Sequence, residues 1–290
     1  MIKISYILSL FVLQSLLFAS QVELEVLGSG GPELDGRAST SYLLWVDHEA
    51  KLIVDMGSGS MLRFEQSGAE LETLEAVVLT HLHIDHSVDL PAFVKAGFFS
   101  HRREALDIIA PSGNAYFPSC SGFLDALFGE GGAYPYMQDV LREDSDSFEI
   151  LPIDIKASST RDYPTFQLTL MRVYHGIVPA LAVRIDVRGK SIIISGDTNN
   201  KNHTLEKLAK NADLFIAHHA IAQNAKGYAT SLHMKPSMIA AVAEKADVKK
   251  VVLTHRMRRT LKDEKQTLQE IKKRYKGKVI FAEDSMKIEL

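Results

Sequence analysis

The stretch that most restricts how this chain can fold is Thr80–His86, where three histidines and one aspartate occur within seven residues. The apolar run Ala76–Leu79 leads directly into it, which is typical of a buried strand that ends in a polar cluster. Burying imidazoles and a carboxylate without partners is costly, so such a cluster beside a core strand indicates that something charged binds there. Neutral imidazoles with a carboxylate suit zinc or a similar first-row metal, and the alternative is a histidine-rich turn in solvent.

The composition is that of a soluble globular protein with a sizeable core. The 290 residues are 46% hydrophobic and 24% charged, and the net charge of −3 provides no general attraction to nucleic acids or anionic membranes. The single cysteine, Cys120, excludes an internal disulfide and a multi-cysteine zinc site. Because no change in composition marks a second domain, residues 21–290 are expected to form one domain.

The first twenty residues differ from the rest of the chain. Lys3 precedes an apolar stretch over residues 4–19, and small residues end it, which is the layout of a secretory signal peptide over residues 1–20. The stretch is short for a membrane span of about 20 residues, but an uncleaved anchor and a buried first strand stay open as alternatives. We therefore expect an exported, periplasmic protein, or one held at the membrane by this segment.

Apolar runs further along the chain predict strands that first follow one another and then alternate with helices, in each half. The predicted strands cover residues 22–27, 41–46, 51–55, 76–79, 106–111, 148–155, 165–174, 181–187, 191–195, 214–217, 251–253 and 279–281. The predicted helices cover residues 60–66, 89–97, 120–128, 202–211, 236–245 and 261–275. This order favours an α/β (α+β) fold of two sheets packed face to face with helices outside. The irregular segment 112–147 is either a substrate-contacting excursion or a solvated connector.

Three further strands end in a side chain that can bind metal. His175 follows the apolar run 168–173, Asp197 follows 192–194, and His255 follows 251–253. One histidine at the end of a strand is usually a hydrogen-bonded turn residue. Four strand ends with the same property, counting the one at residues 81–86, favour a shared metal site.

The order Thr-His-x-His-x-Asp-His, His, Gly-Asp-Thr and Leu-Thr-His resembles the metallo-β-lactamase superfamily, and it spans essentially the whole chain after the leader. The resemblance implies a four-layered αββα sandwich with a pair of metal ions at the sheet edges, two Zn²⁺ or alternatively Mn²⁺ or Fe²⁺. It implies one ion held by His81, His83 and His175, and a second held by Asp85, His86 and His255, with Asp197 bridging them. A histidine at position 83, where the di-iron branch typically has glutamate, favours zinc-dependent hydrolysis.

The segments Ser195–Thr198 and His175–Leu181 are most similar to the ribonuclease Z and arylsulfatase-like phosphodiesterase branch. This similarity implies hydrolysis of phosphodiester or related ester bonds by a hydroxide that bridges the metal ions. It implies two catalytic residues, Asp85 as the anionic metal ligand and His233 as the proton donor to the leaving group. The alternatives are a lactonase or arylsulfatase of the same fold, or an exported zinc-binding protein without catalysis.

Two features depart from ribonuclease Z. His219 stands where those enzymes usually have a glutamate that orients the proton donor, and the chain shows no clear basic arm that would grip transfer RNA. We therefore expect a small anionic or ester substrate and no stable nucleic-acid partner. His219 and Arg256 are the predicted substrate-binding residues, with a solvated positive edge as the alternative for Arg256 and the arginines after it.

Overall fold

The computed structural model describes residues 21–145 and 147–290. The predicted signal peptide, residues 1–20, lies outside the described residues. Among the helices that are described, none is both long enough and apolar enough to cross a membrane.

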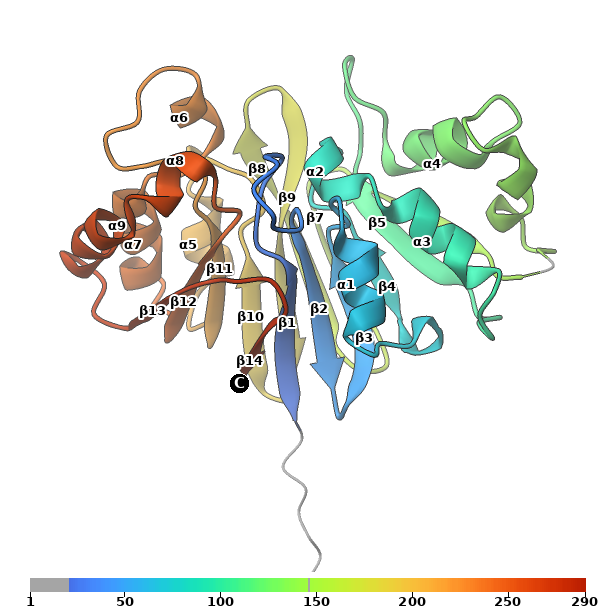
Figure 1. Cartoon of the computed structure of the whole chain (residues 1–290), viewed down its shortest axis with the longest axis horizontal. Coiled ribbons are helices and arrows are strands. Elements are labelled where there is room, and N and C mark those ends of the chain that lie inside the picture. The colour runs from blue at the N-terminus through green and yellow to red at the C-terminus, as the bar shows by residue number, and fades with distance from the viewer. Residues whose placement is uncertain (1–20, 146) are drawn as a thin grey trace, which may run out of the picture.

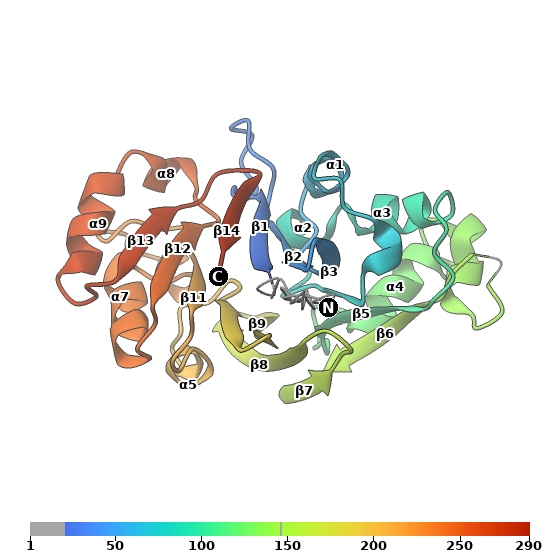
Figure 2. The same ribbon diagram turned by 90° about the horizontal axis from the view of Figure 1, so that it is seen from below.

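Two sheets of seven strands each pack face to face (Figure 1 and Figure 2). The first sheet has the order β14-β1-β2-β3-β4-β5-β6, and the second has the order β13-β12-β11-β10-β9-β8-β7. The strands of the first sheet are β1 (Val22–Gly28), β2 (Ser41–Val46), β3 (Glu49–Val54), β4 (Ala76–Val78), β5 (Leu106–Pro111), β6 (Ile150–Ile155) and β14 (Met286–Glu289). Those of the second are β7 (Ser158–Asp162), β8 (Gln167–His175), β9 (Val178–Val187), β10 (Lys190–Ile194), β11 (Leu214–His218), β12 (Lys250–Thr254) and β13 (Lys278–Phe281).

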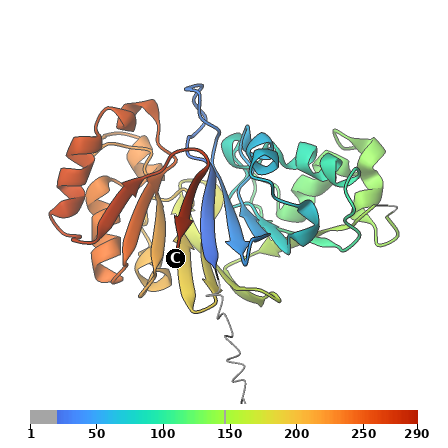
Figure 3. The ribbon, with the colours of Figure 1, turned by 60° about the horizontal axis from the view of Figure 1, so that its bottom comes forward.

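Helices cover the outer face of each sheet, as Figure 3 shows. The first sheet is covered by α1 (Ser60–Gln66), α3 (Leu90–Gly97) and α4 (Cys120–Phe128), and the second by α5 (Thr204–Leu208), α7 (Pro236–Lys245) and α9 (Glu264–Lys272). The remaining short helices are α2 (Ile84–Ser87), α6 (Ala229–Leu232), α8 (Arg258–Leu261), η1 (Leu71–Thr73) and η2 (Pro135–Leu141).

Three buried apolar clusters hold these layers together. Leu44 and Val183 belong to the cluster between the two sheets. Phe93 belongs to the cluster under the first helical layer, and Phe215 to the cluster under the second. Because each sheet buries both of its faces, the predicted four-layered αββα sandwich is confirmed.

Both sheets change from antiparallel to parallel pairing along the chain. Strands β3 to β6 pair in parallel in the first sheet, and β10 to β13 do so in the second. The carboxyl ends of parallel strands meet at one edge of a sheet, and ligands of open α/β sheets bind outside that edge. Polar residues that follow these strands are therefore brought to a common place.

The structure adds two strands that the sequence did not predict. Strand β7 alternates between exposed and partly buried residues at the edge of its sheet. Strand β14 comes from the C-terminus and pairs antiparallel with β1, with Leu24 opposite Ile288. Edge strands bury little apolar surface, so neither sequence contains the apolar run by which the other strands were recognised.

Candidate metal centre

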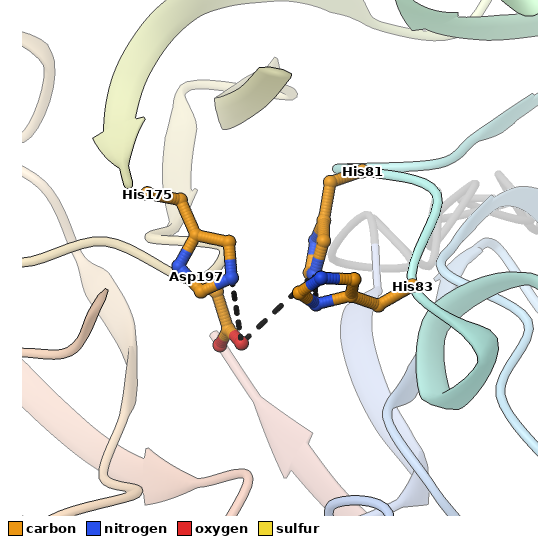
Figure 4. Close-up of side chains that lie close together, drawn as sticks. All are labelled: His81, His83, His175 and Asp197. Atoms are coloured by element: carbon orange, nitrogen blue, oxygen red, sulfur yellow. Dashed lines mark hydrogen bonds and ion pairs between the residues drawn. The ribbon is translucent and has the colours of Figure 1, made fainter. Parts of the chain in front are cut away.

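The residues that follow the strands of both sheets gather in one cluster, part of which is drawn in Figure 4. His81 and His83 lie in the loop after β4, and Asp85 and His86 lie in α2. Figure 4 shows His81 and His83 facing His175 with Asp197 between them. Strand β8 therefore delivers one side of this group, and the β4–α2 segment delivers the other.

The first group of possible ligand atoms comes from His81, His83, His175 and Asp197, with one atom of each residue within 4.8 Å of the others. His81 Nε2 and His83 Nδ1 lie 3.0 Å apart, so the two rings present different nitrogens to the same point. The Nδ1 atom of His175 is 3.0 Å from the Leu232 carbonyl oxygen. That contact leaves Nε2 directed into the cluster.

A second group, within the same distance limit, comes from His86, Asp197, His218 and His255. The predicted ligand Asp85 lies beside it, with Oδ2 at 3.3 Å from His255 Nε2 and 3.6 Å from His86 Nε2. Asp197 belongs to both groups, because its Oδ2 lies 3.4 Å from His255 Nε2 and 3.8 Å from both His175 Nε2 and His86 Nε2. One carboxylate oxygen thus occupies the position expected of a bridge.

Buried nitrogens without partners show that the cluster suits a cation. Within the described residues, the Nε2 atoms of His86, His175 and His255 are buried and have no hydrogen-bond partner. Buried polar atoms are normally paired, so three unpaired nitrogens around one carboxylate oxygen fit metal coordination.

Burial and neighbouring charges shift the pKa values in the cluster in both directions. Although burial opposes it, the carboxylates of Asp55 and Asp85 raise the pKa of His86, and those of Asp197 and Asp85 raise the pKa of His255 well above its usual value. Burial alone would raise the pKa of Asp197, but the nearby imidazoles of His255 and His233 hold it well below its usual value. Burial, reinforced by the neighbouring imidazole of His86, holds the pKa of His81 well below its usual value. The centre therefore contains an ionised carboxylate and a neutral His81, together with two imidazoles, His86 and His255, that would release a proton when a metal ion binds.

Asp55 supports the first of the contributing segments, a role that the sequence did not reveal. Its carboxylate accepts hydrogen bonds from the Thr80 backbone N–H at 2.6 Å and from Thr80 Oγ1 at 2.8 Å, and it lies 2.8 Å from His86 Nδ1. The residue has a positive φ of 64°, which directs the chain away from β3. The sequence signal for this role is the position of the aspartate directly after β3, which pairs with β4. From the sequence we interpreted Asp55 only as the end of a strand.

His218 is the second residue whose role was missed. Its Nδ1 lies 2.8 Å from Asp197 Oδ1 and its Nε2 lies 2.9 Å from the Tyr42 hydroxyl, which in turn contacts Thr254 Oγ1 at 3.2 Å. Burial lowers the pKa of His218 to about 4. Since protein atoms engage both ring nitrogens, His218 is placed to orient Asp197 rather than to bind metal. It ends β11, so the strand-end pattern that identified His175 also applied to it.

The predicted proton donor, His233, lies at the same cluster. It follows α6, and its buried Nδ1 is 3.8 Å from Asp197 Oδ2 and has no hydrogen-bond partner among the described residues. Its ring lies 5.5 Å from that of His175 and 5.8 Å from that of His255. Burial lowers the pKa of His233 to about 3.

The two predicted substrate-binding residues lie elsewhere, and the geometry does not support that role. Arg256 is 2% exposed; it contacts Glu264 and donates to Glu283 at 2.8 Å. His219 is fully buried, with Nε2 at 3.2 Å from Thr267 Oγ1 in α9. Their partners come from α9 and the segment before β14, so both side chains hold the helical layer in place. The alternative of a solvated edge does not hold for Arg256, whose guanidinium is buried, but Arg258 and Arg259 after it are exposed as that alternative expected.

Comparisons with known proteins agree with this geometry. The family model for the metallo-beta-lactamase superfamily matches residues 34–255. Ribonuclease Z of Methanosarcina acetivorans is 24% identical over 301 aligned residues, which cover 91% of this chain and 96% of that protein. Ribonuclease Z of Listeria welshimeri is 28% identical, with 81% and 88% covered.

Solved structures share the fold. The metallo-beta-lactamase fold protein YhfI from Bacillus subtilis has a TM-score of 0.73 at 21% identity, with 93% of this chain and all of that chain covered. Human tRNase Z, short form, has a TM-score of 0.67 at 21% identity, with 92% and 98% covered. The predicted family, the predicted fold and the predicted class of enzyme, a metal-dependent hydrolase of the phosphodiesterase type, are therefore confirmed.

The same comparisons overturn the predicted partners. We expected a small anionic or ester substrate and no stable nucleic-acid partner, which is wrong because the curated relatives are ribonucleases. The reasoning failed because it rested on His219 and on the apparent lack of a basic arm. His219 lies in the packing of the helical layer and carries no information about the substrate.

Proposed function

Because this chain belongs to the metallo-beta-lactamase superfamily, we propose that it hydrolyses phosphodiester bonds of RNA with two divalent metal ions. The observation that carries the proposal is the position of Asp197 Oδ2, between imidazole nitrogens contributed by both sheets. The ribonucleases Z that cover most of the chain support RNA as the substrate.

The proposed ligands are five histidines and two aspartates. One ion is held by His81, His83 and His175, the other by Asp85, His86 and His255, and Asp197 is shared. A set dominated by imidazole nitrogens with two carboxylates favours zinc. Bound there, the ions supply Lewis acidity to the phosphoryl oxygen and a nucleophile at neutral pH.

The protein's own groups prepare the centre for this chemistry. With ions bound, Asp197 would place negative charge between two dications that otherwise repel each other. Asp55 holds His86 with Nε2 directed inward, and His218 fixes the carboxylate of Asp197. His233 lies beside Asp197, within the centre. Burial keeps its imidazole neutral without substrate, and we expect the negative charge of a bound phosphodiester to raise its pKa so that it can donate a proton to the leaving oxygen.

The test is RNA cleavage by protein whose metal content has been measured. We expect the zinc-loaded protein to cleave RNA, to lose activity in a chelator and to regain it when zinc is restored. The variant His83→Ala should lose metal and activity, whereas His101→Ala, which removes an exposed histidine away from the cluster, should retain both. Intact RNA after incubation with protein that carries two zinc ions per chain would contradict the proposal.

Export is a separate proposal, and it rests on the apolar, small-residue-terminated composition of residues 1–20. We expect the mature protein, isolated from the periplasmic fraction, to begin near residue 21. Recovery of the full-length chain from membranes would favour the anchor instead, and recovery of the full-length chain from the cytoplasmic fraction would exclude both.

A further inference from the structure

Tyr42 contributes a phenol hydroxyl to the core between the two sheets. It lies in β2 and is fully buried, and within the described residues it is the only buried member of that cluster whose side chain has a polar atom. Burying a hydroxyl without a partner is costly, and a phenylalanine would fill nearly the same space without that cost. The contacts of the hydroxyl are therefore what distinguishes tyrosine from phenylalanine at this position.

The Tyr42 hydroxyl contacts two residues of the second sheet. It lies 2.9 Å from Nε2 of His218, at the end of β11, and 3.2 Å from Oγ1 of Thr254, at the end of β12. His218 in turn contacts the shared ligand Asp197, and Thr254 directly precedes the proposed ligand His255. One side chain of the first sheet is thus joined to the supports of two ligands that the second sheet supplies.

The direction of each hydrogen bond follows from the neighbouring groups. The carboxylate of Asp197 can only accept, so Nδ1 of His218 carries a proton and donates it to Oδ1 at 2.8 Å. Burial lowers the pKa of His218 to about 4, so the ring carries no second proton at neutral pH. Its Nε2 is then an acceptor, and the Tyr42 hydroxyl is the donor. The Thr254 hydroxyl can donate as well as accept, so it does not compete for the single phenol proton.

The phenol of Tyr42 keeps its proton. Burial raises the pKa of Tyr42 well above its usual value, and the negative charges of Asp55 and Asp197 raise it further. Tyr42 pairs with Val54 of β3, the residue directly before Asp55, so its strand also adjoins the support of the first sheet. The hydroxyl therefore stays a hydrogen-bond donor in a region that is rich in negative charge.

We propose that Tyr42 is a positioning residue of the metal centre, whose hydroxyl holds the His218 ring in the orientation that fixes Asp197. With Oδ1 of Asp197 held by His218, Oδ2 stays directed at the nitrogens of both ligand groups. Tyr42 itself belongs to neither group and acts only through His218. This role rests on the proposed function for its effect on RNA cleavage, whereas the hydrogen bonds can be tested without cleavage.

The first test observes the hydrogen bonds by NMR of zinc-loaded protein labelled with ¹⁵N in its histidine rings. The His218 signals are identified by their loss in His218→Phe. In the wild type we expect a proton on Nδ1 and a proton-free, hydrogen-bonded Nε2. Tyr42→Phe keeps the ring but removes the hydroxyl, and we expect it to shift the Nε2 signal. A wild-type His218 with its proton on Nε2 would overturn the role of Tyr42 without any variant at residue 42.

The second test is a double-mutant cycle on the turnover of RNA. Loss of one buried hydrogen bond corresponds to about a fivefold effect, so Tyr42→Phe should lower kcat about fivefold and leave KM and zinc content unchanged. In the His218→Phe background the same change should cause no further loss, because the residue through which Tyr42 acts is already gone. Additive losses from the two substitutions would overturn the role of Tyr42.

Tyr163→Phe is the matched control. Tyr163 packs against the same cluster, and its hydroxyl donates to Asp107 Oδ2 at 2.6 Å, but Asp107 belongs to neither group of ligands. Chemical denaturation should show a loss of stability in both variants, whereas only Tyr42→Phe should lower kcat and shift the His218 signal. An equal fall in kcat in Tyr163→Phe would show a general effect of lost stability and would overturn the role of Tyr42.

The outcomes separate the role of Tyr42 from the proposed function. RNA cleavage by the wild type, together with wild-type kcat and unshifted His218 signals in Tyr42→Phe, would leave the function standing and overturn the role of Tyr42. A shifted His218 signal in Tyr42→Phe, with no cleavage of RNA by the zinc-loaded wild type, would overturn the function and leave the positioning of His218 by Tyr42 standing.

Discussion

The two sheets contribute to the metal centre in different ways. The first sheet supplies four proposed ligands from one segment, residues 81–86, after β4. The second sheet supplies one from each of three separate places, His175 at the end of β8, Asp197 after β10 and His255 after β12. A centre built in this way depends on one short loop on one side and on the register of a whole sheet on the other.

The supports differ in the same way. In the first sheet one residue, Asp55, contacts both Thr80, which precedes the ligand segment, and His86, which ends it. In the second sheet His175 is positioned by the Leu232 carbonyl and Asp197 by His218, through unrelated contacts. A substitution at Asp55 should therefore displace several ligands, whereas a substitution at His218 should displace only Asp197.

The largest effect is expected from Asp197→Ala, which removes the one ligand common to both groups. Loss of a carboxylate between two dications costs several kcal/mol of transition-state stabilisation, and we expect RNA cleavage to fall about a thousandfold or more. Metal analysis should find fewer than two ions per chain. Cleavage and metal content equal to those of the wild type would show that Asp197 is not a metal ligand.

Asp55→Asn comes next and tests whether the first sheet depends on a single support. The amide has one acceptor oxygen where the carboxylate has two, so it cannot hold both Thr80 and His86. We expect a loss of about 10–100-fold in metal affinity, measured by competition with a chelator, at both ions together. Asp144→Asn, at an exposed position, is the control, and loss of one ion alone would contradict a shared support.

His218→Phe tests the corresponding support in the second sheet. It removes the partner of Asp197 Oδ1 but leaves the Oδ2 contacts in place, so we expect activity to fall about tenfold with both ions retained. Steady-state cleavage and metal content measured on the same sample check this. A loss as large as that of Asp197→Ala would make His218 a ligand, and the two sheets would then be more alike than we infer.

Arg256→Met should have the smallest effect on catalysis, because this side chain supports the helical layer. We expect KM for RNA to stay at the wild-type value and the free energy of unfolding to fall by about 1–3 kcal/mol. Chemical denaturation measures the second quantity, and Arg188→Met, at an exposed ion pair with Asp47, is the control for both. A raised KM for RNA with an unchanged free energy of unfolding would support the original prediction that Arg256 contacts the substrate.

The sequence predicted most of the fold because the buried elements have strong patterns. Helices α1, α4 and α7 were predicted with the ends that the structure shows. The long helix predicted over residues 261–275 is instead the shorter α9 (Glu264–Lys272), and only its first predicted residue, Leu261, belongs to the preceding helix α8. Its charged sequence has a clear apolar stripe but no marked start, so the pattern could not locate the interruption at 262–263.

The site was predicted as far as residue type and chain order carry information. Residues 81–86 are recognisable because their ligands are contiguous, and His255 because it follows an apolar run. Asp55 and His218 also lie at strand ends, but they bind other protein groups, and the identity of those groups depends on which strands become neighbours, which periodicity does not give. Arg256 was misread for a related reason, since closeness to His255 in the sequence does not set the direction of its side chain.

The pairing of β14 with β1 also sets an order of events when the chain is made. Strand β1 emerges from the ribosome among the first residues of the domain, but its outer neighbour is among the last. Asp284, just before β14, accepts hydrogen bonds from the backbone N–H groups of Ser29 at 3.0 Å and Ala38 at 2.8 Å. Contacts that span almost the whole chain form slowly, and an unpaired edge invites association with other chains. The first sheet can be completed only after residues 286–289 have been made, so removal of this strand should favour aggregation.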